Sequence, residues 1–172
     1  MTATAGRAAA APASTPAALT VVDVLGRAGA EVAVGVPDSQ LDGVLAAMAA
    51  RMPVEFTLRE DIAVAAAVGA GLAGRLFAVF MKNAGLGTSL DAIVSLSIAA
   101  EVPIVLVVGW AGAGTDTLPH HVVMGRRTRG LLDAIGVPHD VVTGDGDDPA
   151  RLAGRWAGCL RDQRPYALLV RP

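Results

Sequence analysis

The chain has 172 residues, which is enough for one domain with a substantial core and too few for two ordinary domains. It is 53% hydrophobic but only 3% aromatic, so aliphatic side chains and alanine must build the core. The formal net charge of -2 argues against a nucleic-acid-binding face, and the single cysteine, Cys159, excludes an internal disulfide and a cysteine-based metal cluster, as suits a cytoplasmic protein.

Residues 1–18 are Ala, Thr, Pro, Ser and Gly apart from Met1 and Arg7, and we predict a disordered tail there. The tail lacks the long apolar core of a signal peptide. The most apolar later stretch, 92–110, is interrupted by Glu101 and Pro103 and so does not predict a membrane span. Residues 19–172 are expected to form the folded domain.

Helical and extended patterns alternate along this domain, with short breaks between them. In chain order we expect a helix at 19–28, a strand at 31–36, a helix at 39–51, a strand at 54–58, a helix at 60–73, a strand at 76–81, a helix at 88–99, a strand at 104–108, a helix at 128–135, a strand at 139–142, a helix at 149–161 and a strand at 166–170. Repeated strand–helix units predict a three-layer α/β/α domain with a mainly parallel sheet of about six strands.

Three expected loops follow the carboxyl ends of strands, where ligands bind in such folds. They are polar or glycine-rich and cover residues 35–39, 82–87 and 109–124. Each has an ordinary alternative: Asp38 or Ser39 could simply cap a helix, and Asn83 with its glycines could form only a tight turn. The third loop is harder to dismiss, because long loops in compact domains are usually functional or mobile. Their coincidence at one edge predicts a binding site.

Residues 35–138 resemble the alpha subunit of the phosphonopyruvate and sulfopyruvate decarboxylases, the pyrimidine-binding half of a thiamine diphosphate enzyme. The matching pieces are GVPDS at 35–39, RE at 59–60 before an alanine-rich helix, MKNAGLG at 81–87, and MGR at 124–126 leading into LLDAIGVP at 131–138. No single piece is decisive, but their order and spacing agree over roughly two thirds of the chain. The resemblance implies a thiamine diphosphate-enzyme pyrimidine-binding domain.

The resemblance implies that Glu60 is the catalytic carboxylate that hydrogen-bonds the aminopyrimidine ring of thiamine diphosphate. A proton shared with the ring nitrogen favours the imino tautomer, whose nitrogen can remove the thiazolium C2 proton. Without the resemblance, Glu60 would be interpreted as a helix N-terminal carboxylate stabilised by the helix dipole. The other expected cofactor-binding residues are Pro37, Asn83, Gly85, Leu86 and Gly87.

The chain departs from the family pattern at several positions. Where that family commonly reads Met-Gln-Asn-Ser-Gly-Leu-Gly, this chain has Lys82 and Ala84. Lys82 could attract a phosphonate or sulfonate, or could mark a different substrate. His121 matches the family histidine and is a candidate for catalysis, by binding the substrate anion or shuttling protons, or it is an exposed loop histidine without such a role. The expected substrate-binding residues are Asp38, Ser39, Arg59, Lys82, His120, His121 and Arg126.

Two motifs are set aside. Residues 69–74 match G-x-G-x-x-G, but a strand-like segment follows almost at once, whereas a dinucleotide site requires a helix there. These small residues are instead expected to let a helix pack closely on the sheet. Gly144-Asp145-Gly146 imitates the start of the metal and diphosphate motif of thiamine enzymes, but no Asn follows it, so we expect a turn.

Because the chain lacks that motif, we expect it to offer no metal ligand. The cofactor's diphosphate must be neutralised by a divalent metal and by helix N-termini. We therefore expect a separate beta subunit to hold the diphosphate and Mg²⁺, in a hetero-oligomer with at least two copies of each chain. The apolar helices that follow Glu60 and Gly87 are the expected interface.

The expected activity is decarboxylation of 3-phosphonopyruvate to phosphonoacetaldehyde and carbon dioxide. Sulfopyruvate is the alternative substrate, because phosphonate and sulfonate are both compact tetrahedral anions. A non-catalytic α/β binding or regulatory subunit is the alternative from another functional class.

Overall fold

Helices and strands alternate along the part of the chain that the structure, a computed structural model, describes, which is residues 15–171. In chain order the elements are α1 (Pro16–Ala28), β1 (Val32–Gly35), η1 (Ser39–Leu41), α2 (Asp42–Ala49), β2 (Val54–Phe56), α3 (Glu60–Leu72), β3 (Phe77–Lys82), α4 (Asn83–Ala92), η2 (Ile93–Ile98), β4 (Val105–Gly109), α5 (Pro119–Ala134), β5 (His139–Val142), α6 (Pro149–Arg161) and β6 (Tyr166–Val170).

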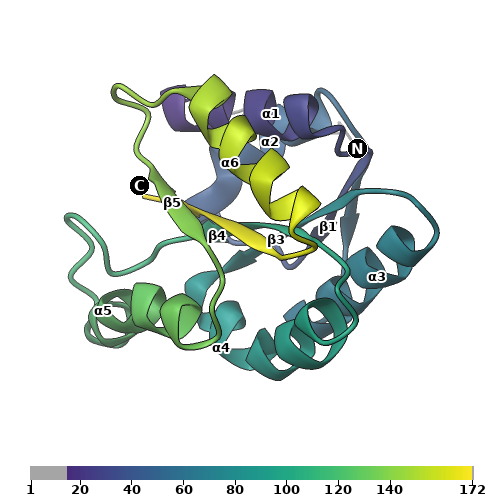
Figure 1. Ribbon diagram of the computed structural model, residues 1–172. Helices are drawn as coiled ribbons and strands as arrows, with labels where there is room; N and C mark the ends of the chain where they lie inside the picture. The colour runs from purple at the N-terminus through teal and green to yellow at the C-terminus, as the bar shows by residue number, and fades with distance from the viewer. Residues whose placement is uncertain (1–14, 172) are drawn as a thin grey trace, which may run out of the picture.

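The strands form one parallel six-stranded sheet with the order β2-β1-β3-β4-β6-β5. Figure 1 shows α1, α2 and α6 on one face of this sheet and α3, α4 and α5 on the other. This arrangement confirms the predicted three-layer α/β/α fold. Within residues 15–171, no helix has both the length and the apolar character needed to cross a membrane.

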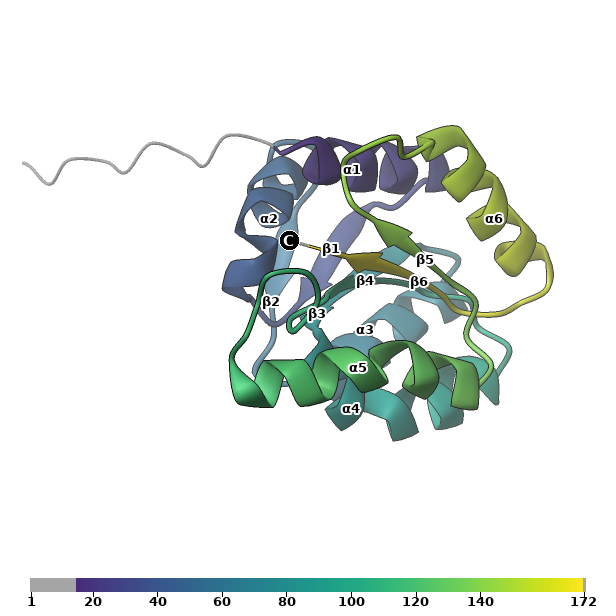
Figure 2. The same ribbon diagram turned by 90° about the vertical axis from the view of Figure 1, so that its left-hand side faces the viewer.

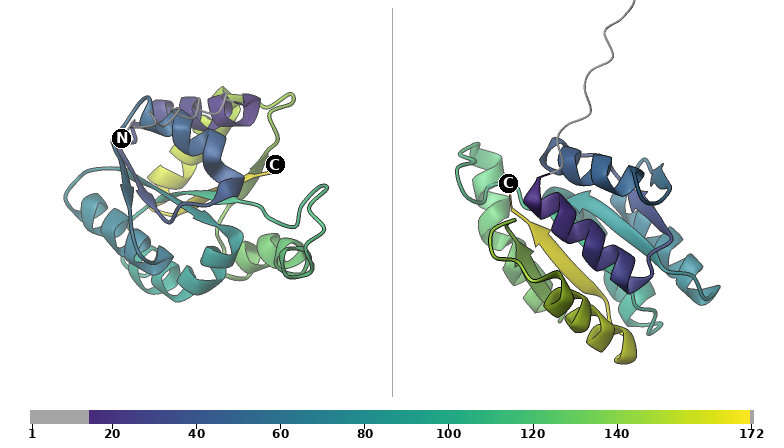
Figure 3. Two further views of the ribbon diagram at one scale, coloured as in Figure 1. Left: turned by 180° about the vertical axis from the view of Figure 1, so that it is seen from behind. Right: turned by 90° about the horizontal axis from the view of Figure 1, so that it is seen from above.

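The sheet separates two hydrophobic cores. Val105 and Val107 of β4 face the core beneath α1, α2 and α6, whereas Leu106 and Val108 face the core beneath α3, α4 and α5. Every residue of β4 and β6 is buried, because helices cover both faces of these strands. On the first face, α1 and α6 lie side by side across the sheet (Figure 3).

Helix α1 begins at Pro16, three residues before its expected start, so residues 16–18 belong to the folded domain and not to the tail. Pro16 occupies the first turn of this helix, where its missing N–H costs nothing. The hydroxyl of Thr15 caps the helix by accepting a hydrogen bond from the Ala18 backbone N–H at 3.2 Å. The rest of the predicted tail, residues 1–14, lies outside the described residues.

Two helices replace parts of the expected loops. Helix α4 begins at Asn83, so the glycine-rich 83–87 segment is helical and not a turn. Helix α5 begins at Pro119, nine residues earlier than expected, which leaves only 110–118 as the loop after β4. Glycines in these two segments predicted loops, but in the structure they allow close packing of helices. A methyl group on Gly125, for example, would overlap with the Ala111 and Gly112 carbonyl oxygens.

The structure gives neither the G-x-G-x-x-G segment at 69–74 nor Gly144-Asp145-Gly146 the surroundings of a cofactor motif. Residues 62–68, which come directly before the G-x-G-x-x-G segment, lie inside α3 and do not form the strand that a dinucleotide site requires. Gly71, near the end of α3, lies against Val102. Residues 143–148 form a turn in which the Asp147 carboxylate accepts hydrogen bonds from the Thr143 and Gly144 backbone N–H groups at 2.9 and 2.7 Å. Gly144 has a φ of 89°, which favours glycine at that position.

Replacement of Gly35 by alanine tests the close approach of β1 to β3. A methyl group at Gly35 would overlap with the Phe80 carbonyl, whereas one at Gly26, inside α1, would meet open space. We expect Gly35→Ala to lower the free energy of unfolding by about 1–3 kcal/mol through overpacking. Gly26→Ala should raise it by roughly 0.5–1 kcal/mol through helix propensity. Urea unfolding of both variants measures the contrast, and equal stabilities would contradict this packing.

Candidate functional site

The carboxyl ends of three adjacent strands bring the expected site residues to one edge of the sheet (Figure 2). Asp38 follows β1, Lys82 ends β3, and the 110–118 loop follows β4. The parallel register pairs Lys82 with Gly109, so the end of β3 lies beside the start of that loop. Residues that are far apart in the sequence therefore meet at this edge.

Glu60 is the first residue of α3, and its position suits a carboxylate because the helix N-terminus carries partial positive charge. The side chain lies directly against Gly85 of α4, where a methyl group would overlap with the carboxyl group. Among residues 15–171 the Glu60 carboxylate has no ion-pair partner, since the nearby Arg59 pairs with Asp61 at 2.8 Å. Glu60 is therefore a partly buried carboxylate available to a ligand.

Asn83 connects three parts of the site. Its amide nitrogen donates hydrogen bonds of 2.9 Å to the Ala111 carbonyl and to the Thr128 hydroxyl. A carbonyl can only accept, so the orientation of the amide is determined. The side-chain oxygen of Asn83 is then buried without a hydrogen-bond donor from residues 15–171. A buried acceptor without a donor is costly, which suggests that a ligand completes it.

Four side chains, Asp38, Lys82, His121 and Asp116, form a continuous polar row that we call the polar chain. Lys82 Nζ lies 3.8 Å from Asp38 Oδ1 and 2.9 Å from His121 Nε2. On the other side of the imidazole, His121 Nδ1 lies 2.7 Å from Asp116 Oδ2. Lys82 is 26% exposed, whereas the other three side chains are only 11–13% exposed. Lys82 is thus the most exposed side chain of the polar chain.

Asp116 is a further residue of this site that was not predicted from the sequence. Its carboxylate accepts hydrogen bonds from the backbone N–H groups of Gly112 at 2.9 Å and Leu118 at 3.2 Å. These bonds, led by the one from Gly112, and the neighbouring His121 lower the pKa of Asp116 below its ordinary value. The available signal was an acidic residue inside a glycine-rich loop only five positions before a candidate histidine.

The remaining predicted site residues differ in their surroundings. Arg59 is exposed and held by Asp61, whose hydrogen bond raises the pKa of the Arg59 guanidinium. His120 is exposed and packs edge-on against the ring of His121, with 4.3 Å between ring centroids. Arg126 is exposed on α5. Four further predicted residues are the exposed Pro37, Ser39 and Gly87 and the fully buried Leu86.

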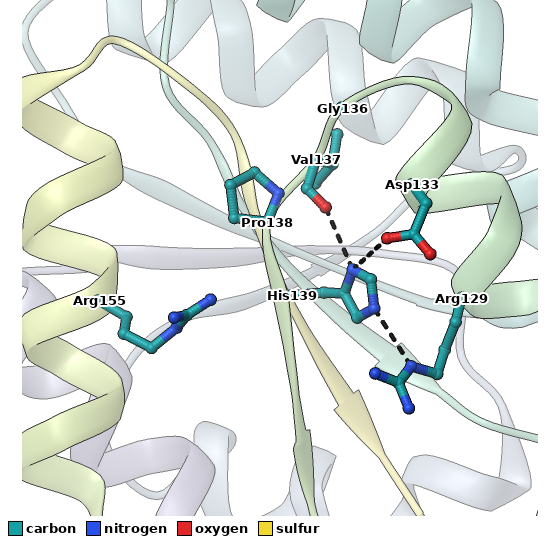
Figure 4. Close-up of a pocket in the computed structure, with 7 residues that line it drawn as sticks. All are labelled: Arg129, Asp133, Gly136, Val137, Pro138, His139 and Arg155. Carbon is teal, nitrogen blue, oxygen red and sulfur yellow. Dashed lines mark hydrogen bonds and ion pairs between the residues drawn. The ribbon is translucent and has the colours of Figure 1, made fainter.

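A pocket of about 360 Å³ lies away from this edge, around the start of β5 (Figure 4). It surrounds His139, the first residue of β5. His139 Nδ1 lies 3.2 Å from the Val137 carbonyl oxygen, and its Nε2 accepts a hydrogen bond from Arg129. None of the predicted site residues lines this pocket. In residues 15–171, no group of three or more His, Cys, Asp or Glu side chains could hold a metal ion.

The lowered pKa of Asp116 predicts a pH-dependent contribution to stability. A carboxylate whose pKa is lower in the folded state stabilises the fold above its ordinary value of 3.8 and loses this effect as the pH falls through the lowered pKa. We expect Asp116→Asn to be less stable than the parent chain at pH 7, by a difference that shrinks below pH 3.8. Chemical denaturation at several pH values measures this difference.

Asp145→Asn, in the exposed 143–148 turn, is the matched control for the loss of one negative charge. If the difference between the parent chain and Asp116→Asn were the same at pH 7 and below pH 3.8, Asp116 would not be stabilised as a carboxylate in the folded chain.

Comparison with known proteins identifies a matching family. The model of the family "thiamine pyrophosphate enzyme, N-terminal TPP binding domain" matches residues 16–131. This region contains β1, β3 and β4 and all the residues of the polar chain.

Several relatives share this region. The sulfopyruvate decarboxylase subunit alpha of Methanothermobacter thermautotrophicus is 36% identical over 114 residues, which cover 64% of this chain and 68% of that protein. The same subunit from Methanocaldococcus jannaschii is 36% identical over 80 residues, covering 46% of this chain and 47% of the relative. The phosphonopyruvate decarboxylase of Streptomyces viridochromogenes is 32% identical over 114 residues, covering 65% of this chain and 29% of that enzyme. The chain thus spans less than half the length of the last two relatives.

Proposed function

Because the chain belongs to the family of thiamine pyrophosphate enzymes, as an N-terminal TPP binding domain, we propose that it is the pyrimidine-binding subunit of a thiamine diphosphate-dependent 2-oxo acid decarboxylase. The observation that carries the proposal is the Glu60 carboxylate, which begins α3 at the carboxyl edge of the sheet and has no ion-pair partner within residues 15–171. It lies where a ligand can reach it, beside a glycine that leaves room for it.

The donors and acceptors at this edge fit an aminopyrimidine ring. Glu60 can share a proton with a ring nitrogen, and the unsatisfied oxygen of Asn83 can accept a hydrogen bond from an amino group. When bound, thiamine diphosphate supplies the nucleophilic carbon and the electron sink that decarboxylation requires. The chain itself holds the proton at Glu60 and orients the substrate. Pro37, Gly85, Leu86 and Gly87 are the proposed surroundings of the ring.

A partner subunit is part of the proposal. Mg²⁺ and the diphosphate are assigned to a beta subunit, because no Asn follows Asp145 in this sequence to complete the metal and diphosphate motif. Two of the relatives are themselves named as alpha subunits, which supports a partner subunit. The proposed assembly is a hetero-oligomer with at least two copies of each chain. Ile62 and Leu72 on α3 and Leu96 on η2 are exposed apolar side chains suited to that interface.

The leading substrate is 3-phosphonopyruvate, which would yield phosphonoacetaldehyde and carbon dioxide. Sulfopyruvate is the second candidate and is favoured by the names of the relatives from Methanothermobacter thermautotrophicus and Methanocaldococcus jannaschii. Both substrates carry a second anion besides the carboxylate. Of the predicted substrate-binding cations, Lys82 has its charged group in the polar chain. Arg59 is exposed and paired with Asp61. Lys82 is thus the proposed anchor for the second anion, while Asp38, Ser39, His120, His121 and Arg126 are further candidates for substrate contact.

Substitution of Glu60 tests the catalytic proposal. We expect Glu60→Gln to abolish carbon dioxide release from either substrate, because an amide cannot hold the ring nitrogen's proton as a carboxylate does. The assay uses this chain co-expressed with a diphosphate-binding beta chain, with thiamine diphosphate and Mg²⁺ added. Glu101→Gln, at an exposed site after η2, is the control. Full activity of Glu60→Gln would favour the alternative of a non-catalytic binding or regulatory subunit for this chain.

Substitution of Lys82 tests the substrate proposal. A hydrogen bond to a charged group contributes roughly 1.5–3 kcal/mol, so we expect Lys82→Met to raise KM for the doubly anionic substrate by about 10- to 100-fold. Arg59→Met should change it little, because Arg59 is exposed and already paired. Steady-state kinetics of both variants measure the contrast. An unchanged KM in Lys82→Met would remove Lys82 from the substrate site.

A further inference from the structure

The contacts of His121 determine its tautomer. A lysine ammonium group has only donors, so the 2.9 Å contact requires His121 Nε2 to act as the acceptor for Lys82. The remaining ring proton must then lie on Nδ1, where it is donated to Asp116 Oδ2 at 2.7 Å. With Lys82 protonated, the contacts therefore make His121 a neutral imidazole with its proton on Nδ1. The positive charge of this row resides on Lys82 and not on His121.

Asp116 is firmly anchored at the end of this row. Two backbone N–H groups, from Gly112 and Leu118, hold its carboxylate within the 110–118 loop. Gly112 has a φ of 76°, and a methyl group there would overlap with the His121 carbonyl, so this loop packs tightly on the first turns of α5. The carboxylate is thus a rigid reference point from which the imidazole is oriented.

The Lys82 side chain needs a contact that holds its ammonium group in one position. A lysine side chain is flexible, and ordering it costs conformational entropy. Asp38 Oδ1 lies 3.8 Å from Nζ and competes with a ligand for the same charge. Asp38 Oδ2 is buried without a partner from residues 15–171, which increases that competition. The neutral acceptor at His121 Nε2 offers Lys82 a second contact without neutralising it.

We propose that Asp116 is a positioning residue that acts through His121 to hold the Lys82 ammonium toward the second anion of the substrate. The assignment of Lys82 to that anion rests on the proposed function, whereas the tautomer of His121 does not. Asp116 itself contacts neither substrate nor cofactor in this proposal. Its effect is on substrate binding and not on the chemical step.

The tautomer is measured on the full 172-residue chain by NMR of ¹⁵N-labelled histidine. The sequence has three histidines, so the imidazole spectrum is simple. We expect the neutral Nδ1-protonated form of His121 near neutral pH, and a shifted Nδ1–H signal in Asp116→Asn, because an amide oxygen is a weaker acceptor than a carboxylate. A protonated Nε2, a doubly protonated ring, or an unchanged Nδ1–H signal in Asp116→Asn would overturn the inference.

His139 is the internal control for this measurement. Its Nδ1 faces the Val137 carbonyl oxygen and its Nε2 accepts from Arg129, so the same tautomer is expected there (Figure 4). This pair of contacts lies at the start of β5, away from the polar chain, so Asp116→Asn must leave His139 unchanged. A simultaneous change at His139 would attribute the effect to general disruption and overturn the assignment to Asp116.

The position of the ammonium group has a separate readout. Lys82 is the only lysine in the sequence, so labelled lysine gives a single side-chain signal. Methylphosphonate and methanesulfonate carry the second anion without the 2-oxo acid. We expect at least one of them to shift the Lys82 signal in a saturable manner, with roughly tenfold weaker binding in Asp116→Asn. Equal binding to the parent chain and Asp116→Asn, or no binding to either, would overturn the proposal.

Kinetics of the reconstituted complex complete the test. We expect Asp116→Asn to raise KM for the doubly anionic substrate about tenfold with little change in kcat, and to leave KM for pyruvate unchanged. Lys82→Gln should show the same pattern, and the double variant should be no worse than Lys82→Gln alone. If the increases in KM of the two single variants multiplied in the double variant, or if Asp116→Asn lowered only kcat, Asp116 would not act by positioning Lys82. Asp145→Asn is the charge-matched control and should match the parent chain.

These experiments separate two kinds of failure. If the complex releases no carbon dioxide from any substrate, the proposed function fails, but the histidine and lysine spectra still decide whether Asp116 positions Lys82. If the complex is active and the spectra of Asp116→Asn match those of the parent chain, the positioning proposal fails and the proposed function stands.

Discussion

The parallel pairing of β3 with β1 and β4 is the constraint on which the rest of the structure depends. It places the ends of three strands next to each other, so that Asp38, Lys82 and the 110–118 loop share one edge. Helices on both faces bury the backbone and side chains of the central strands, which keeps this edge rigid. A site assembled from such distant segments requires this alignment, since none of the segments could hold the others in place alone.

Close backbone approach is the second requirement of the site. Gly85 leaves room for the Glu60 carboxyl group, and Gly125 lets α5 pack against the carbonyl groups of Ala111 and Gly112. These glycines lie in helices, where they cost stability relative to alanine. Burial against neighbouring elements offsets that cost. The same close packing places Asn83 within hydrogen-bond distance of both Ala111 and Thr128.

The charges at the site edge are arranged so that one cation stays accessible. Asp116 is satisfied by two backbone N–H groups and an imidazole, and Asp38 is nearly buried beside Lys82. In the inferred tautomer His121 is neutral, so Lys82 carries the positive charge of the polar chain. A carboxylate–imidazole–ammonium row of this kind directs a flexible side chain without adding further charge. In the proposed function, the site thereby directs the Lys82 ammonium group toward an anionic ligand.

The sequence by itself determined the fold class and the identity of most candidate residues. The alternation of helical and extended segments predicted the parallel sheet. Residues 104–108 fit it because a strand buried on both faces must be apolar throughout. The GVPDS, RE and MKNAGLG segments indicated where the carboxyl edge carries polar groups. The starts of α4 and α5 were predicted wrongly, because glycine and proline favour turns locally and only tertiary packing makes these residues helical.

The contacts within the site were decided by the tertiary structure. Nothing in the sequence separates Lys82 from Arg59 as a site cation, but the fold pairs Arg59 with Asp61 at the surface and aligns Lys82 with His121. Asp116 could not be identified as a site residue until α5 was seen to begin at Pro119, which brings His121 back over the 110–118 loop. Side-chain pairing depends on distances between segments far apart in the chain, and those distances exist only once the sheet has formed.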